Sequence, residues 1–153
     1  DCSSRGLGDV YKRQIMYYIK LIMKNTIFKL TEHVYYFSLL VLLILYLFPG
    51  SLIGYLLYGN LGQQPNLISN PIGTSINHLI FFSYITILAM TVRLRAKNIL
   101  TNYRFILFIS CVLEISHLII PNRAFEFYDL IANFTGVVII LLLNSFIKWR
   151  KHL

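Results

Sequence analysis

Long apolar runs alternate with short polar segments along the chain, and four of the runs are long enough to be membrane-spanning helices. At 1.5 Å per residue, a helix of about 18–20 residues is about 30 Å long, which matches the hydrocarbon core of a bilayer. The first run ends at Pro49 and Gly50 and the third at Pro121, residues that do not readily continue a helix. The predicted spans cover about residues 31–48, 75–92, 101–120 and 128–147. We therefore predict an all-α fold, an integral membrane four-helix bundle.

The first fourteen residues, DCSSRGLGDVYKRQ, are small, polar and Gly-containing, whereas the sequence that follows is rich in Ile, Tyr, Lys and Asn. They resemble a translated adapter or vector remnant, and the alternative is a disordered cytoplasmic tail. In either case we place residues 1–14 outside the fold and assign residues 15–153 to one membrane domain. A signal peptide is the alternative for the first span. Its apolar run is long and no small-x-small cleavage site follows it, so we expect a retained helix.

The loop of residues 49–74 is rich in proline and glycine, yet its middle, SLIGYLLYG, is apolar. We expect an ordered turn packed over the bundle, and the alternative is a segment that lies in the membrane interface. Thr74 or Ser75 is the expected N-cap of the second span.

The composition excludes a soluble domain. The chain has 153 residues, of which 57% are hydrophobic and 13% are charged, whereas a soluble domain is about 25% charged. Between Glu32 and Arg93 the sequence contains no Lys, Arg, Asp or Glu. A membrane protein can carry so long an uncharged stretch because lipid solvates its outward faces.

The net charge of +8 comes from basic blocks beside the apolar runs, around Lys24, Arg95 and Arg150. Such blocks are typical of cytoplasmic loops. No block interleaves bases with exposed aromatic residues, so nucleic-acid binding is not indicated. We predict a multi-pass protein of the cytoplasmic (inner) membrane with both termini in the cytoplasm and Arg123 facing outward. Aromatic anchors at the cytoplasmic side are expected at Tyr35, Tyr36, Tyr103 and Trp149.

Polar and charged residues gather near the outer ends of the predicted spans. The third span ends outside with Glu114 and His117, one turn apart on the same helix face. The fourth span starts outside with Asp129 and Asn133, and the second with His78. We expect these side chains to converge at one depth with the loop between the third and fourth spans. The candidate ligand-binding residues are His78, Glu114, His117, Arg123, Asp129 and Asn133.

The cost of burying charge indicates how these residues should pair. A carboxylate facing lipid costs about 2.5–3.5 kcal/mol on insertion scales, so Glu114 should face the bundle interior with a partner. Arg123 is the expected partner of Glu114, Asp129 or both, because a planar guanidinium can bridge two carboxylates. The alternatives are a purely structural ion pair at Glu114, a helix cap at Asp129 and an interhelical hydrogen bond at Asn133. Gly136 is expected to let a neighbouring helix approach closely.

Motifs for metals and cofactors are sparse. Glu114-x-x-His117 has the spacing of carboxylate-bridged metal helices, but a second helix would have to supply His78 or Asp129. We therefore expect no metal and no cofactor. Serines near His117 are too common in helices to indicate a nucleophile, and the sequence has no Gly-rich phosphate loop.

Three segments, Glu114-Ile-Ser-His117, Pro121-Asn-Arg123 and Asp129-Leu-Ile-Ala-Asn133-Phe-Thr-Gly136, resemble the pattern of the VanZ-like family. His78 matches the histidine that opens that family's second helix. The family often has Gln at the position of His117, and an Asp-Lys pair where this chain has Thr74 and Ser75. The resemblance covers about residues 15–153 and implies a four-helix membrane protein. The namesake is a determinant of low-level resistance to teicoplanin, a glycopeptide antibiotic that binds cell-wall precursors.

Three classes of function follow from this sequence. The leading hypothesis is an outer-face pocket in which Arg123 holds the anionic group of a cell-envelope precursor or other amphiphilic ligand, with membrane lipids as partners. The second is a membrane enzyme in which Glu114 or His78 acts as general base on a lipid-linked substrate. The third is a structural or assembly module, in which the polar cluster stabilises the bundle.

Overall fold

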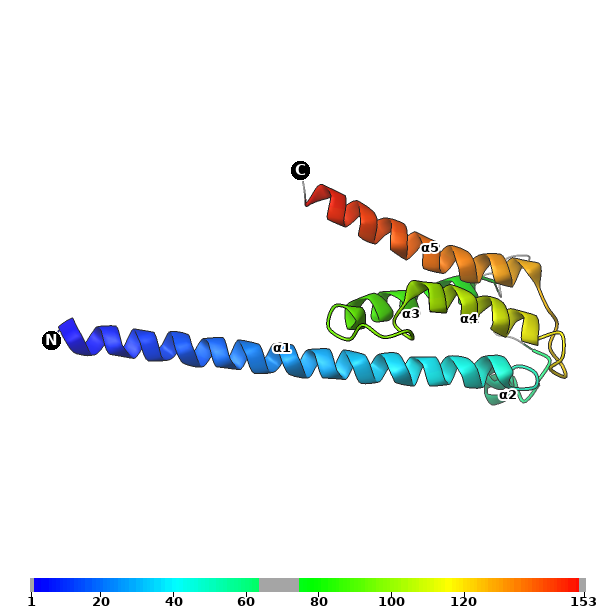
Figure 1. Ribbon diagram of the computed structural model, residues 1–153. Helices are drawn as coiled ribbons and strands as arrows, with labels where there is room; N and C mark the ends of the chain where they lie inside the picture. Colours follow the sequence, from blue (N-terminus) through cyan, green and yellow to red (C-terminus); the bar gives the residue numbers. More distant parts are fainter. Residues whose placement is uncertain (1, 64–74, 152–153) are drawn as a thin grey trace.

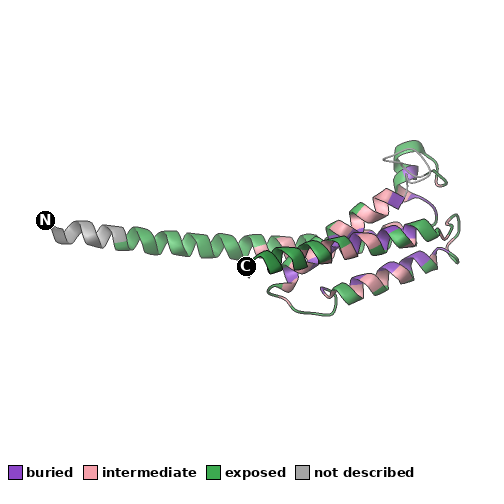
Figure 2. Ribbon diagram, turned by 90° about the horizontal axis from the view of Figure 1, so that it is seen from above, coloured by how far each residue is buried: buried purple, intermediate pink, exposed green. Residues whose placement is uncertain are grey.

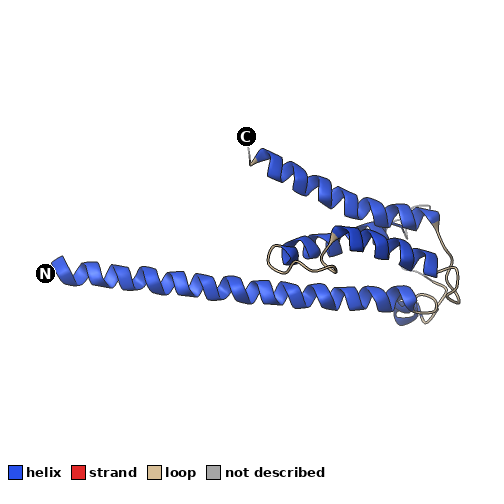
Figure 3. Cartoon of the chain, viewed as in Figure 1, coloured by secondary structure: helices blue, strands red, loops and turns tan. Residues whose placement is uncertain are grey.

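The chain folds entirely into helices and connecting loops in the part that the structure describes. The structure is a computed structural model that describes residues 2–63 and 75–151, with side chains from Val10 onward. Figure 3 shows helices joined by loops, which confirms the all-α prediction. The helices are α1 (Cys2–Leu47), α2 (Leu52–Tyr58), α3 (Ser75–Arg93), α4 (Tyr103–Ser116) and α5 (Phe127–Arg150).

The four longer helices run alternately up and down beside one another (Figure 1). Both chain termini lie toward one end of the bundle. The segment after α1 and the connection between α4 and α5 lie at the other end. The last turns of α1 and α4 therefore meet the first turns of α3 and α5, as the alternating spans predicted.

Three helices are long and apolar enough to cross a membrane: Val10–Leu47 within α1, then α3 and α5. The chain is therefore a multi-pass membrane protein by the length and composition of its helices. The predicted second and fourth spans agree closely with α3 and α5. The first and third predicted spans differ from the structure at their ends.

Helix α1 is much longer than the predicted span of residues 31–48, with 46 residues. No proline occurs before Pro49, so nothing in this stretch forces the helix to end earlier. Residues 2–14, for which a disordered tail was the alternative, are helical and belong to α1. Residues 10–26 are all exposed (Figure 2), and packing begins near Phe28. The predicted start thus marks where α1 joins the bundle.

Helix α4 is shorter than the predicted span of residues 101–120, with 14 residues. At 1.5 Å per residue it is about 21 Å long, less than the hydrocarbon core. Asn102 caps its start by accepting a hydrogen bond from the Arg104 amide at 3.1 Å. Beyond Ser116, tighter three-residue turns continue the chain, with the Leu118 and Ile119 amides donating to oxygens three residues back. The apolar run is therefore continuous in sequence but not in helical structure.

The core lies where α1, α3, α4 and α5 meet. One face of α1 supplies Tyr35, Leu42 and Tyr46, at the i, i+7, i+11 spacing of a helical stripe. Tyr35 is fully buried, and its hydroxyl donates to the Leu100 carbonyl oxygen. The prediction of Tyr35 as a membrane anchor is therefore wrong: it ties α1 to the loop between α3 and α4. Tyr103 and Trp149 are exposed, as anchors would be.

Gly136 brings α5 into close contact with α3, as predicted. A Cβ atom on Gly136 would lie 2.5 Å from the Leu79 carbonyl oxygen and 3.1 Å from the Ser83 amide nitrogen. The Ser83 hydroxyl donates to the Gly136 carbonyl oxygen at 3.2 Å. A side chain here would push apart two helix backbones, which cannot move as a flexible side chain can.

The Gly136→Ala variant should therefore be destabilised by about 1–3 kcal/mol, the usual cost of overpacking. The measurement is unfolding of the purified protein in detergent micelles. Gly62→Ala is the matched control, because among the described residues its new Cβ would meet only the Asn60 side-chain oxygen, at 3.5 Å. Equal stability of the two variants would contradict the close approach of α3 and α5.

The loop after α1 contains the short helix α2. The Ser51 hydroxyl caps it by accepting from the Gly54 amide at 2.9 Å, and Gly59 ends it with φ of 68°. Gly54 is buried and packs against the Gln63 backbone, so this part of the loop is an ordered turn. Leu56 and Leu57 are nevertheless exposed. The expected N-cap at Thr74 and the rest of the loop lie outside the described residues.

Candidate functional site

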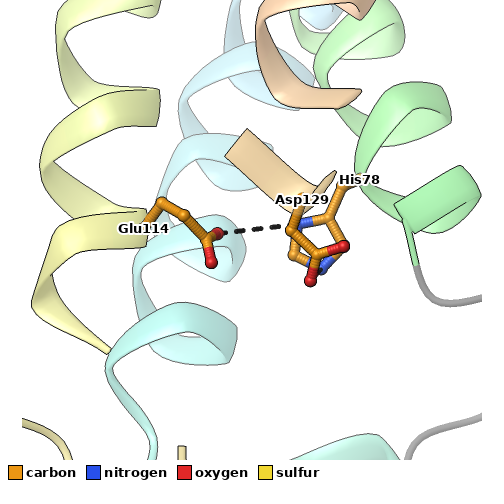
Figure 4. A group of neighbouring side chains, drawn as sticks. All are labelled: His78, Glu114 and Asp129. Carbon is orange, nitrogen blue, oxygen red and sulfur yellow. Dashed lines mark ion pairs between the residues drawn. The ribbon is translucent and has the colours of Figure 1, made fainter. Parts of the chain in front are cut away.

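Three ionisable side chains from three helices converge where the loops after α1 and α4 lie (Figure 4). His78 comes from the first turn of α3, Glu114 from the last turn of α4 and Asp129 from the first turn of α5. One nitrogen or oxygen atom of each lies within 4.8 Å of the other two. The structure therefore brings together the residues that the sequence predicted to share one depth.

Glu114 is fully buried, and its two oxygens have different surroundings. Oε1 lies 3.3 Å from both the Glu126 amide nitrogen and His117 Nδ1. Oε2 has no hydrogen-bond partner among the described residues and lies 4.0 Å from His78 Nδ1. The carboxylate is thus fixed by one oxygen and presents the other toward His78.

Asp129 is held in a similar way. Its Oδ1 accepts a hydrogen bond from the Ser75 hydroxyl at 2.5 Å, which joins the first turns of α3 and α5. Its Oδ2 lies 3.3 Å from His78 Nε2. Asp129 lies in the first turn of α5, where the helix dipole favours a negative charge. It is nonetheless buried and faces α3, so helix capping does not account for its position.

Tyr46 of α1 connects the remaining members of the polar cluster. Its hydroxyl lies 2.6 Å from His78 Nδ1 and donates to Asn133 Oδ1 at 3.1 Å. Its ring stacks on His117, with centroids 5.3 Å apart and planes 16° from parallel. Asn133 thus makes an interhelical hydrogen bond, one of the alternatives that the sequence left open.

Arg123 does not pair with the carboxylates, and the prediction that it bridges them is wrong. Among the described residues, its hydrogen-bond partners are the carbonyl oxygens of Leu45, at 2.5 Å from Nη2, and Phe48, at 3.4 Å from Nε. The last carbonyls of a helix have no partner within the helix and carry partial negative charge. Arg123 therefore caps the C-terminus of α1. His78 lies between the two carboxylates, in the position that was expected for Arg123.

Burial affects the charged groups of the loop before α5. Desolvation lowers the pKa of the Arg123 guanidinium, and the nearby Tyr46, Glu114 and Asp129 oppose this effect. An arginine in such a site keeps its charge at neutral pH. Partial desolvation raises the pKa of Glu126, and the negative charges of Asp129 and Glu114 raise it further. Burial is the largest cause of both shifts, so this corner of the molecule disfavours charge of either sign.

A cavity of about 140 Å³ lies beside the cluster, between the end of α1, α2 and the start of α3. Its walls combine apolar side chains with titratable and cationic ones. The lining residues include Leu42, Leu45, Tyr46, Leu52, Ile53, His78, Phe81, His117 and Arg123. Three of the six predicted site residues thus border one cavity: His78, His117 and Arg123.

A second cavity, of about 410 Å³, lies toward the other end of the bundle among α3, α4 and α5. Arg93 and Lys148 are among its lining residues, and none of the predicted site residues is. These basic residues belong to the blocks that the charge pattern assigns to the cytoplasmic side. The smaller cavity is therefore the better candidate for a specific site.

Sequence reasoning missed Tyr46, which contacts His78, and considered Ser75 only as a helix cap and not as the partner of Asp129. A signal for Tyr46 was present, since it is the only polar side chain in the aliphatic run LLVLLILYLF. A buried phenol needs a hydrogen-bond partner, so Tyr46 had to face other polar residues or the membrane surface. Ser75 gave no comparable signal, because serine at a helix start is common.

Comparison with protein families, with curated proteins and with solved structures finds no match for this chain. The resemblance to the VanZ-like family therefore depends only on the residue pattern and stays a prediction.

Proposed function

We propose that the protein is a four-helix protein of the cytoplasmic membrane that binds an anionic amphiphile near the outer surface. Both termini lie in the cytoplasm in this proposal, because the basic blocks lie near the termini and between α3 and α4. The polar cluster then lies beneath the outer surface. In this proposal α4 also spans the membrane, in addition to α1, α3 and α5, and the turns beyond Ser116 continue it toward the outer surface.

The observation that carries the proposal is the lining of the smaller cavity. Arg123 provides hydrogen-bond donors at a wall to which Leu42, Leu45 and Phe81 contribute apolar side chains. A small number of placed polar groups on an apolar wall is the usual composition of a ligand site. A molecule with an anionic headgroup and an apolar chain matches both parts of this lining.

The anchoring of Arg123 makes it suited to hold the headgroup. Two of its nitrogens bind the last turn of α1, which fixes the direction of the guanidinium at little further entropic cost. A guanidinium has five N–H donors, so donors remain for a phosphate or carboxylate. The resemblance to the VanZ-like family adds lipid-linked cell-wall precursors as the proposed source of the ligand, and with them a proposed role in glycopeptide resistance.

The test is binding of a phosphatidylglycerol probe to the purified protein in detergent micelles, with phosphatidylethanolamine as the comparison lipid. The Arg123→Gln variant removes the charge but keeps an amide that can donate to the α1 carbonyls. Loss of hydrogen bonds to a charged group costs about 1.5–3 kcal/mol, so phosphatidylglycerol should bind about 10–100-fold more weakly.

Arg104→Gln is the matched control, because Arg104 is exposed at the start of α4, away from the cavity. It should bind the anionic lipid like the wild type. Unchanged binding by Arg123→Gln, or equal binding of the two lipids by the wild type, would contradict the proposal.

A further inference from the structure

The direction of the hydrogen bonds around His78 determines which ring nitrogen carries hydrogen. The side-chain oxygen of Asn133 can only accept, so the Tyr46 hydroxyl donates its one hydrogen there. The Tyr46 oxygen must then accept from His78 Nδ1–H, 2.6 Å away. His78 Nε2 is left, and it faces Asp129 Oδ2 at 3.3 Å.

Two atoms with lone pairs face each other at that position unless a cation lies between them. A proton on His78 Nε2 would satisfy this pair, but it would leave Glu114 Oε2 buried without a partner. A divalent ion can satisfy all three groups at once. It would also balance the charges of the two buried carboxylates. Arg123 does not pair with them, because it binds the carbonyl oxygens at the end of α1.

We propose that His78, Glu114 and Asp129 form a divalent metal site that takes Zn²⁺. One imidazole nitrogen and two carboxylate oxygens are ligands that zinc accepts, and three protein ligands are typical of sites that keep one position open. The three groups come from α3, α4 and α5, with one ligand atom of each within 4.8 Å of the others. The metal site goes beyond the proposed function and does not depend on it.

A second layer of hydrogen bonds fixes each ligand, as in known metal sites. The Ser75 hydroxyl holds Asp129 Oδ1, and the Tyr46 hydroxyl accepts from His78 Nδ1–H. The Glu126 amide and His117 hold Glu114 Oε1. Each ligand residue thus has one side-chain atom held by a hydrogen bond and one that is not: Nε2 of His78, Oδ2 of Asp129 and Oε2 of Glu114.

The experiment measures zinc in the purified full-length chain in detergent micelles after removal of metal with EDTA and exposure to Zn²⁺. We expect about one tightly bound zinc per chain, and a visible absorption band when Co²⁺ replaces zinc. His78→Ala, Glu114→Gln and Asp129→Asn should each lose the bound metal. His33→Ala and Glu32→Gln, which change the same residue types in α1, should retain it.

The Ser75→Ala variant separately tests the second layer of hydrogen bonds, which holds the ligands in position. It removes no ligand, so it should keep the stoichiometry at saturating zinc but weaken zinc affinity about 10–100-fold. Wild-type protein that binds no more zinc than His78→Ala, or Co²⁺ without a visible band, would overturn the proposal in favour of a protonated His78. Arg123→Gln should still bind zinc, so failure of the lipid-binding proposal and failure of the metal site give different results.

Discussion

We expect the His78→Ala variant, kept free of metal, to lose about 3–5 kcal/mol of stability, the cost of removing one partner from a buried charged pair. His78 lies 3.3 Å from Asp129 and 4.0 Å from Glu114, and both carboxylates are buried. Without the imidazole, the two like charges share one apolar site and the Tyr46 hydroxyl loses a partner. The measurement is denaturant unfolding of the purified protein in detergent micelles.

A matched control and a rescue variant distinguish the loss of this charged pair from nonspecific destabilisation. His33 is an exposed histidine on α1, and its replacement by alanine should change stability by less than about 0.5 kcal/mol. Adding Glu114→Gln to His78→Ala removes one stranded charge and should recover part of the loss. If the double variant were less stable than His78→Ala alone, the charge of Glu114 would not be the cause.

The convergence of the polar residues could be predicted because it depends on helix direction alone. In an up-and-down bundle, the ends of α1 and α4 lie beside the starts of α3 and α5. Glu114 and Asp129 are close to such ends in the sequence, so their proximity follows from the order of the spans. The position of Gly136 at a helix contact could be predicted for a different reason, because small residues are common where membrane helices approach closely.

The partners within the cluster could not be predicted, because they depend on details that the sequence pattern does not contain. Charge alone favoured Arg123 as the partner of Glu114, yet the exposed carbonyls at the end of α1 compete for the same guanidinium. Those carbonyls exist at every helix end and leave no trace in the residue types. The choice between them and a carboxylate was set by where the loop after α4 places Arg123.

The hydrophobic pattern likewise could not predict where α1 begins or where α4 ends. The pattern measures compatibility with lipid, so it continued through residues 117–120, where the backbone has already left the α-helix. It also stopped at the polar residues near Thr31, although α1 continues to Cys2 because nothing there breaks a helix. Hydrophobic runs thus predict the number and order of the long helices better than they predict where each helix begins or ends.

The proposed orientation, with both termini in the cytoplasm, predicts a clear difference in labelling. A cysteine at position 124, between α4 and α5, should react with a membrane-impermeant maleimide in intact cells. A cysteine at position 97, between α3 and α4, should react only after the cells are permeabilised. Both positions are exposed, and both variants would carry Cys2→Ser and Cys111→Ser to remove the natural thiols. Ala124 is preferred to Asn122, whose φ of 58° would strain a cysteine.

The labelling pattern also tests which leaflet would supply the proposed amphiphile. With position 124 outside, the cavity beside Arg123 lies near the outer surface, where lipid-linked precursors of the cell wall are used. The reverse pattern would place most of the basic blocks outside and the cavity at the cytoplasmic side, contrary to the charge rule. The ligand would then have to come from the inner leaflet. The geometry of His78, Glu114 and Asp129 would be unchanged, so the zinc measurement would keep its meaning in either orientation.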